Sequence, residues 1–171
     1  HPGDRLKILS GGHFPSAWRM FCHYAGLSRL FKQMPVFEGH YLLPSKKPRG
    51  LVNVDWVTGA CLAVRRSVWV QLGGLSERWF MYAEDIEFCH RVGKLGLRIC
   101  LDGNAHATHL VGTSDGARGD SANPAWVVNL YDFYRTSLPS NMLTAVAWRT
   151  SVAVGLMSRS LAYRAAALRS G

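Results

Sequence analysis

The sequence predicts an α/β domain, because short β-branched runs alternate with amphipathic helical segments. Residues 51–57 and 61–64 are rich in valine and flank Gly59, as expected for short strands meeting at a bend. Residues 84–95 place apolar side chains on one side of a helix, and Gly96 follows as a stop. With 171 residues, 48% of them hydrophobic, the chain is long enough for one hydrophobic core.

The segment before these strands predicts one helix and a loop. Pro15 suits a first helical turn, and residues 17–31 space their apolar side chains near the helical period. Residues 32–50 contain three prolines and a basic stretch, which is typical of an exposed connection.

After the strands, short elements alternate with glycine stops. Ser67 can cap a helix over 68–72 that ends at Gly73. Beyond the helix at 84–95, residues 97–101 alternate as a strand does.

The last third of the chain predicts a loop followed by helices. Residues 112–124 are rich in glycine, serine and aspartate, and residues 126–137 and 141–168 are helical in composition. We therefore divide the chain into a region over 1–115 and a loop with basic C-terminal helices over 116–171.

The net charge of +9 raises the question of anionic partners. No acidic residue follows Asp132, whereas five arginines do, so the excess is concentrated in the C-terminal helices. A nucleic-acid-binding module is disfavoured, because no helix-turn-helix, zinc-finger or RNA-binding motif accompanies these arginines. Arg149 interrupts the apolar run over 142–157, which favours an amphipathic helix on a membrane surface over a spanning one. The alternative is a helix that packs on its own domain with its arginines outward.

Cysteine spacing indicates a reducing compartment. Cys22, Cys61, Cys89 and Cys100 form no CxxC pair, so free thiols are expected. The opening residues lack the apolar stretch of a signal peptide.

Several motifs follow one another in a specific order. DWVTGA occupies 55–60, an arginine pair 65–66 and LGGLSERWFMYAED 72–85, before the helix EFCHRVGKLG and His109. This order closely resembles the second half of family 2 glycosyltransferases, especially bacterial rhamnosyltransferase-like members.

The resemblance implies a partial, Rossmann-like GT-A fold that lacks its N-terminal nucleotide-binding half. In keeping with this, the chain contains no Asp-x-Asp motif and no glycine-rich phosphate loop. We therefore expect the isolated chain to be inactive.

The resemblance assigns the catalytic base to Asp85, with Glu84 supporting it or contacting the acceptor. An alcohol is a poor nucleophile at neutral pH, so an inverting transfer needs a base beside the acceptor hydroxyl. The alternative is that both acids only cap the helix.

The resemblance also implies a divalent metal, Mn²⁺ or Mg²⁺, held mainly by the missing half and assisted by His109. Imidazole suits Mn²⁺ better than Mg²⁺. A purely structural histidine is the alternative.

Small and aromatic residues are the candidates for the sugar pocket. Each has a packing alternative, as a β-bulge for the small residues and as core for the aromatic ones. The predicted set is Asp55, Trp56, Gly59, Ala60, Trp79, Phe80 and Tyr82.

Together these features predict part of an enzyme of cell-envelope polysaccharide synthesis. It would transfer a sugar, with inversion, from a nucleotide-sugar donor to a glycan or polyprenyl-linked acceptor. We expect it in the cytoplasm, at the inner face of the cell membrane. The alternative from another class is a non-catalytic domain that binds the glycan acceptor.

Overall fold

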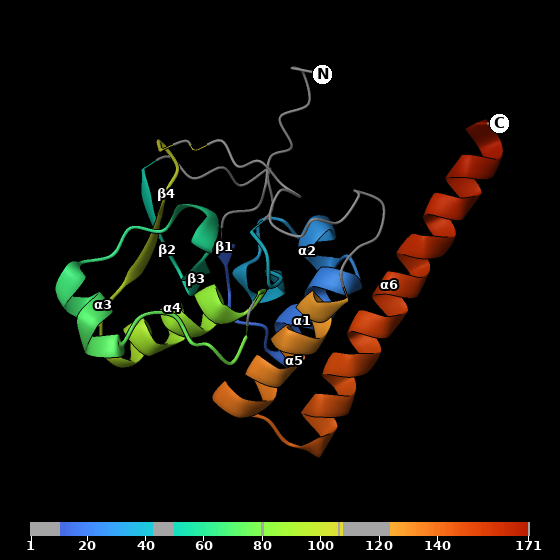
Figure 1. Cartoon of the computed structure of the whole chain (residues 1–171). Helices are drawn as coiled ribbons and strands as arrows, with labels where there is room; N and C mark the ends of the chain where they lie inside the picture. Colours follow the sequence, from blue (N-terminus) through green and yellow to red (C-terminus); the bar gives the residue numbers. More distant parts are fainter. Residues whose placement is uncertain (1–10, 43–49, 80, 106, 108–123, 171) are drawn as a thin grey trace.

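The computed structural model describes residues 11–42, 50–79, 81–105, 107 and 124–170. Over these residues the chain is mixed α/β, with helices α1 to α6 and short strands β1 to β4 (Figure 1). The predicted class is confirmed at this level. The loop predicted over 112–124 lies outside the described residues, except for its last residue.

The strands form two antiparallel pairs. β1 (Gly11–Gly12) pairs with β3 (Trp56–Val57), and β2 (Leu51–Val54) pairs with β4 (Ile99–Asp102). β2 and β3 are separated only by Asp55. This residue therefore lies at the step from one pair to the other.

Glycine is required in β1 by close backbone contacts. A Cβ atom on Gly11 would lie 2.6 Å from the carbonyl oxygen of Trp56, and one on Gly12 would overlap the carbonyl oxygen of His40. Because no side chain intervenes, the chain passes between these two segments and brings His13 next to Asp55.

The helix predicted over 17–31 is divided in two. α1 (Ala17–Tyr24) begins where the Ser16 hydroxyl accepts a hydrogen bond from the Arg19 N–H, at 3.3 Å. Gly26 then adopts a left-handed φ of 78° and separates α1 from α2 (Leu27–Leu30). A 3-10 turn, Pro35–Phe37, lies in the segment predicted as a loop.

The strand predicted over 61–64 is wrong. Gly59–Cys61 forms a 3-10 turn because the Thr58 hydroxyl accepts from the Ala60 N–H, at 3.4 Å, and residues 62–64 pair with no described strand. α3 (Arg66–Leu72) begins slightly before the predicted position. It ends as predicted at Gly73, whose φ is 73°.

α4 (Glu84–Lys94) matches the predicted amphipathic helix. Its buried side is formed by Ile86, Phe88, Cys89 and Val92. On the other side, Arg91 donates to Glu87 at 2.7 Å and to the carbonyl oxygens of Leu72 and Gly74 at 2.6 and 2.8 Å. These bonds attach α4 to the end of α3.

The predicted C-terminal helices are α5 (Ala125–Ser137) and α6 (Met142–Ser170). Both share one hydrophobic cluster with the preceding elements, because Phe133, Trp148 and Val152 pack with Met20 and Trp79. In Figure 1, α6 runs beside α1 and α5 and its C-terminal end projects beyond the rest of the molecule. Among the described residues, no helix combines the length and apolar character needed to cross a bilayer.

Candidate active site

Asp85 lies in the first turn of α4 and is held by backbone groups. Its Oδ2 atom accepts from the Gly59 N–H at 2.9 Å, and its Oδ1 atom accepts from the Ile86 N–H at 2.8 Å. The Thr58 hydroxyl also donates to this carboxylate. None of these partners is a cation, and Asp85 forms no ion pair with any described residue.

Partial burial determines the basicity of Asp85. Burial raises the pKa of this carboxyl and outweighs the opposing hydrogen bonds from Gly59, Ile86 and Thr58. A carboxylate with a raised pKa binds a proton more readily than an ordinary one, which suits a general base.

Glu84 points back toward the start of the helix. Its Oε2 atom accepts from the N–H of Ala83, the N-cap residue, at 2.9 Å, so Glu84 satisfies one donor at the start of α4. Burial, with a smaller contribution from Asp85, raises the pKa of Glu84. The two neighbouring acids therefore differ, since only Asp85 contacts the DWVTGA segment.

Gly59 and Ala60 are both exposed beside Asp85. A Cβ atom on Gly59 would lie 3.6 Å from Cβ of Asp85, which is an ordinary contact distance. Glycine at this position keeps the space next to the carboxylate free of a side chain.

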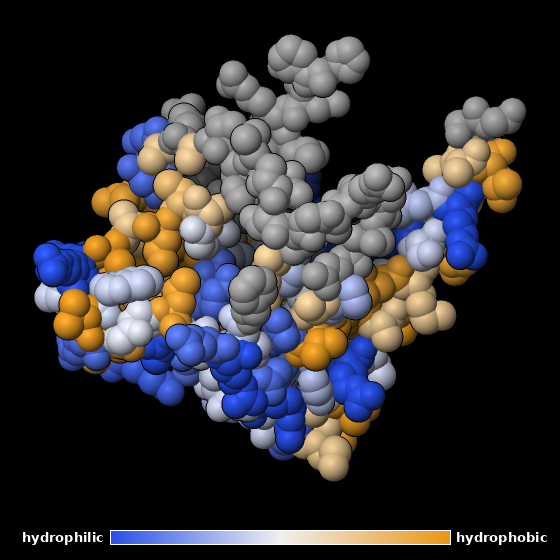
Figure 2. Space-filling view, viewed as in Figure 1, coloured by the Kyte–Doolittle hydropathy of each residue, from blue (hydrophilic) through white to orange (hydrophobic). Residues whose placement is uncertain are grey.

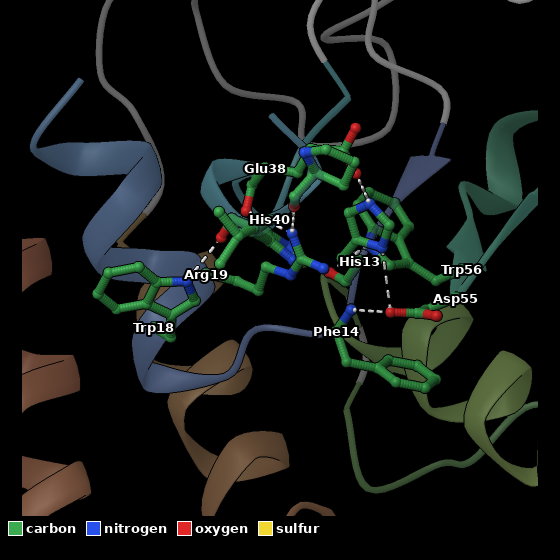
Figure 3. Close-up of polar contacts among 10 residues, drawn as sticks. His13, Phe14, Trp18, Arg19, Glu38, His40, Asp55 and Trp56 are labelled. Atoms are coloured by element: carbon green, nitrogen blue, oxygen red, sulfur yellow. Dashed lines mark hydrogen bonds and ion pairs between the residues drawn. The ribbon is translucent and has the colours of Figure 1, made fainter. Parts of the chain in front are cut away.

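Asp55 belongs to a polar network that the sequence did not predict (Figure 3). Its Oδ2 atom accepts from the Phe14 N–H at 2.9 Å and lies 3.4 Å from Nδ1 of His13. The Nε2 atom of His13 contacts Glu38 at 2.7 Å, so the imidazole bridges two carboxylates.

The pKa values of this network favour charged groups. The hydrogen bond to Asp55 raises the pKa of His13, although burial opposes the shift. Burial alone would raise the pKa of Asp55, but the bonds from His13 and from the Phe14 N–H outweigh it and lower the pKa. The network therefore anchors the start of β3, two residues upstream of the Thr58–Gly59 corner.

Trp56 is part of this anchor, and its ring is packed in the core. It is only 4% exposed, stacks on His40 with ring centroids 5.1 Å apart, and donates to the His13 carbonyl oxygen at 3.1 Å. The side chain of Trp56 is therefore part of the core, which is the alternative to a sugar contact given above for the aromatic residues.

Trp79 has a similar structural role in the aromatic loop before α4. Its indole N–H donates to Asp132 of α5 at 2.9 Å, and Arg78 forms two hydrogen bonds with the same carboxylate at 2.8 and 2.9 Å. Asn129, also on α5, donates to the Met81 carbonyl oxygen at 2.6 Å. α5 thus holds the loop that leads into Asp85.

Tyr82 differs from the two tryptophans. Its ring is 37% exposed and its φ is 68°, a left-handed value that is costly for a residue with a Cβ atom. It lies three residues before Asp85 in a strained loop, as residues that contact ligands often do. Phe80 lies outside the described residues.

The metal prediction has no test in the described part of the chain. There, no three His, Cys, Asp or Glu side chains gather as a metal site would need. His109 lies outside the described residues, so its assignment stays a prediction.

An open apolar cavity of about 400 Å³ lies between β3, α3, α4 and β4. Its lining includes Val57, Leu62, Phe88 and Cys89 but not Asp85. Burial raises the pKa of Cys89 to about 11, so this thiol is protonated and packs as an apolar group.

Comparison with known proteins gives relatives of one kind. The chain is 41% identical over 102 residues, 55% of its length, to N-acetylglucosaminyl-diphospho-decaprenol L-rhamnosyltransferase of Mycobacterium tuberculosis. It is 39% identical over 66 residues, 37% of its length, to low-salt glycan biosynthesis hexosyltransferase Agl10 of Haloferax volcanii. Rhamnosyltransferase WbbL of Escherichia coli is 39% identical over 56 residues, 33% of this chain.

The chain is glycosyltransferase-like. The resemblance predicted from the ordered motifs is therefore confirmed. The glycosyltransferase-like chain covers 32% of the mycobacterial relative, 22% of the archaeal one and 21% of the Escherichia coli one. No family model and no solved structure matches it.

Sequence reasoning missed the residues that support the site. His13 and Glu38 are far from Asp55 along the chain, and no local sequence pattern links the three residues. Asp132 is the last acidic residue of the glycosyltransferase-like chain. Its position before a stretch without acids was the single sequence feature that set it apart.

Proposed function

We propose that this chain is the acceptor-side part of an inverting, family 2 glycosyltransferase with a GT-A fold. The supporting observation is the position of Asp85, a partly buried carboxylate with a raised pKa. It accepts a hydrogen bond from the exposed Gly59 and forms no ion pair with any described residue. The similarity to two rhamnosyltransferases and a hexosyltransferase gives the reaction class.

In the proposed reaction, an acceptor hydroxyl attacks the anomeric carbon of a nucleotide-activated sugar. Asp85 takes the hydroxyl proton as the new glycosidic bond forms and the bond to the nucleotide diphosphate breaks. Attack from the face opposite the leaving group inverts the anomeric configuration. Glu84 accepts from the N–H of the N-cap residue Ala83 and so helps to keep the start of the helix, with Asp85, in place.

The proposed donor is a nucleotide-linked hexose or deoxyhexose, and the acceptor is a glycan or a polyprenyl-linked sugar. The names of the relatives support both classes. Because the chain spans about a third of the mycobacterial relative, donor binding is assigned to sequence outside it. Residues there would hold a divalent metal with His109, which would stabilise the leaving diphosphate.

Exposed residues of the two site segments are proposed to contact the sugars. Gly59 and Ala60 leave space beside Asp85, and Tyr82 offers an aromatic surface. Asp55, Trp56 and Trp79 act through position, since their polar atoms bind other parts of the chain. The enzyme is proposed to act at the cytoplasmic face of the cell membrane.

The test uses the complete reading frame that contains this chain, with nucleotide-sugar donors and a lipid-linked acceptor. We expect Asp85→Asn to lower kcat by about 10²-fold or more, the scale of a general base, while the circular dichroism spectrum stays unchanged. Glu84→Gln is the matched control, and its loss should be about tenfold smaller than that of Asp85→Asn.

Product analysis completes the test. The anomeric configuration of the product, read by NMR, should be opposite to that of the donor. Retained configuration, or full activity of Asp85→Asn, contradicts the proposal. Acceptor binding without turnover for every donor would favour the non-catalytic binding domain.

A further inference from the structure

One face of helix α6 packs against the rest of the domain. Ala145, Trp148, Val152 and Gly155 are buried against the preceding elements. Trp148 donates to the Pro15 carbonyl oxygen at 2.8 Å, and the guanidinium of Arg159 lies 4.9 Å from the ring centre of Tyr24. The inward face of α6 is therefore occupied as far as Arg159.

The opposite face of α6 is apolar and exposed. Its large side chains recur three, four, seven or eleven residues apart, which places them along one line of a helix. Their exposed fractions are 81% for Leu143, 65% for Val154, 66% for Met157, 64% for Leu161 and 86% for Leu168. We call this line the outer stripe.

The outer stripe continues past the body of the domain. No described side chain after Arg159 is buried, and the C-terminal end of α6 projects away from the other helices (Figure 1). Figure 2 shows apolar and hydrophilic patches alternating along this helix.

Charge on α6 has a single sign. The helix carries Arg149, Arg159, Arg164 and Arg169 and contains no acidic residue. An apolar stripe with only basic neighbours is complementary to a surface that is apolar inside and negatively charged outside.

We propose that α6 lies flat on an anionic lipid surface, with the outer stripe inserted among the acyl chains and with Arg149 and Arg164 at the phosphate groups. Arginine is suited to this position because its long aliphatic stem reaches from apolar surroundings to a phosphate. The proposal goes beyond the sugar-transfer reaction and does not depend on it.

A second copy of the chain fits the stripe less well. Arg164 falls on the stripe itself, between Leu161 and Leu168, and would be buried in a helix pair. Since α6 contains no glutamate or aspartate, a pair of these helices would bring arginines together without a carboxylate partner.

The test is flotation of the full chain with phosphatidylcholine vesicles, with and without phosphatidylglycerol. We expect the bound fraction to be about tenfold higher on the anionic vesicles and to fall at high salt, which screens the arginines. Leu161→Glu should reduce binding about tenfold by placing a charge in the stripe. Ala166→Glu adds the same charge to exposed α6 on the side away from the stripe, and it should keep binding within about twofold.

Two further measurements separate the alternatives. Arg149→Gln with Arg164→Gln should lower binding to anionic vesicles and leave the weak binding to neutral vesicles unchanged. Failure of the wild-type chain to float with anionic vesicles, or equal loss in the Leu161 and Ala166 variants, overturns the proposal. A dimer in sedimentation equilibrium that Leu161→Glu dissociates would assign the stripe to a second copy. Because flotation needs no donor sugar, its failure is distinct from failure of the transfer assay.

Discussion

The Gly59 N–H donates to Oδ2 of Asp85 at 2.9 Å and joins two motifs that lie 26 residues apart. The bond sets the orientation of the carboxylate at the start of α4. The Thr58 hydroxyl adds a second donor from the same corner. Basicity and orientation of the candidate base are therefore influenced by groups of the DWVTGA segment.

Replacing Thr58 should change the pH dependence of catalysis. The Thr58 hydroxyl lowers the pKa of Asp85, so Thr58→Val should raise it further and move the acid limb of kcat/KM to higher pH. Thr58→Ser keeps the hydroxyl and serves as the control. An acid limb that is identical in the valine and serine variants would show that Thr58 does not act on the base.

Tyr82 should combine backbone strain with a role in activity. At its φ of 68°, glycine is about 1 kcal/mol less strained than alanine, so Tyr82→Gly should unfold at higher denaturant than Tyr82→Ala. Both variants lose the ring and should lose transfer activity to the same extent. Wild-type activity in either variant would remove Tyr82 from the proposed pocket.

Asp132 should act on the site through the aromatic loop. Asp132→Ala leaves the buried Trp79 N–H without its acceptor, which costs about 1–3 kcal/mol, and it releases Arg78. We expect a lower Tm and reduced kcat, because the loop before Asp85 loosens. Asp102→Ala removes an acid from the end of β4 and is the control. Equal effects of the two substitutions would contradict a specific role for α5.

Local patterns predicted most of the helices, because these depend on neighbours in the sequence, whereas the assignment of the base came from the resemblance to a family. The glycine after α3, the amphipathic spacing of α4 and its two leading acids are all visible within a few residues. The step at Asp55 and the turn at Gly59–Cys61 were missed, since the first depends on His13 and Phe14 and the second on how the Thr58 side chain bonds. Neither a long-range hydrogen bond nor a local bond from side chain to backbone leaves a periodic signal in the sequence.

The aromatic residues illustrate the same limit. In the sequence, Trp56, Trp79 and Tyr82 are equal candidates for the sugar pocket, and each has core packing as its alternative. In the structure the tryptophans are buried because His40 and Asp132 provide ring and polar partners, whereas Tyr82 stays partly exposed. Partners contributed by distant segments decide which aromatic side chain is available to a ligand.

Two histidines, the buried His40 and the half-buried His23, should make the fold sensitive to mild acid. Burial lowers the pKa of His23 to about 4 and that of His40 to about 3. Between pH 6.5 and 5 the unfolded chain therefore binds protons that the folded chain does not, so the free energy of unfolding falls as the pH falls. The expected loss at pH 5 is about 2 kcal/mol for each histidine.

Denaturant unfolding at pH 7 and pH 5 measures this loss. His23→Phe removes a titrating group that contacts Tyr24 and Tyr41, and the loss of stability between pH 7 and pH 5 should be about 2 kcal/mol smaller than in the wild type. Stability that does not change over this range would mean that both imidazoles gain protons within the fold.

Gly155 should control the attachment of α6. A Cβ atom there would overlap the ring of Tyr24, and the surrounding core, with Trp148 and Val152 buried, leaves little room for adjustment. We expect Gly155→Ala to lower the free energy of unfolding by about 1–3 kcal/mol, the cost of overpacking.

Gly93 in α4 is the matched control, because a Cβ there would lie 3.9 Å from the nearest atom, a methyl group of Ile99. Gly93→Ala should raise stability by up to about 1 kcal/mol through helix propensity. Opposite signs for two glycine-to-alanine changes, measured by denaturant unfolding, can only come from packing at the α1–α6 contact, and equal signs would refute that contact.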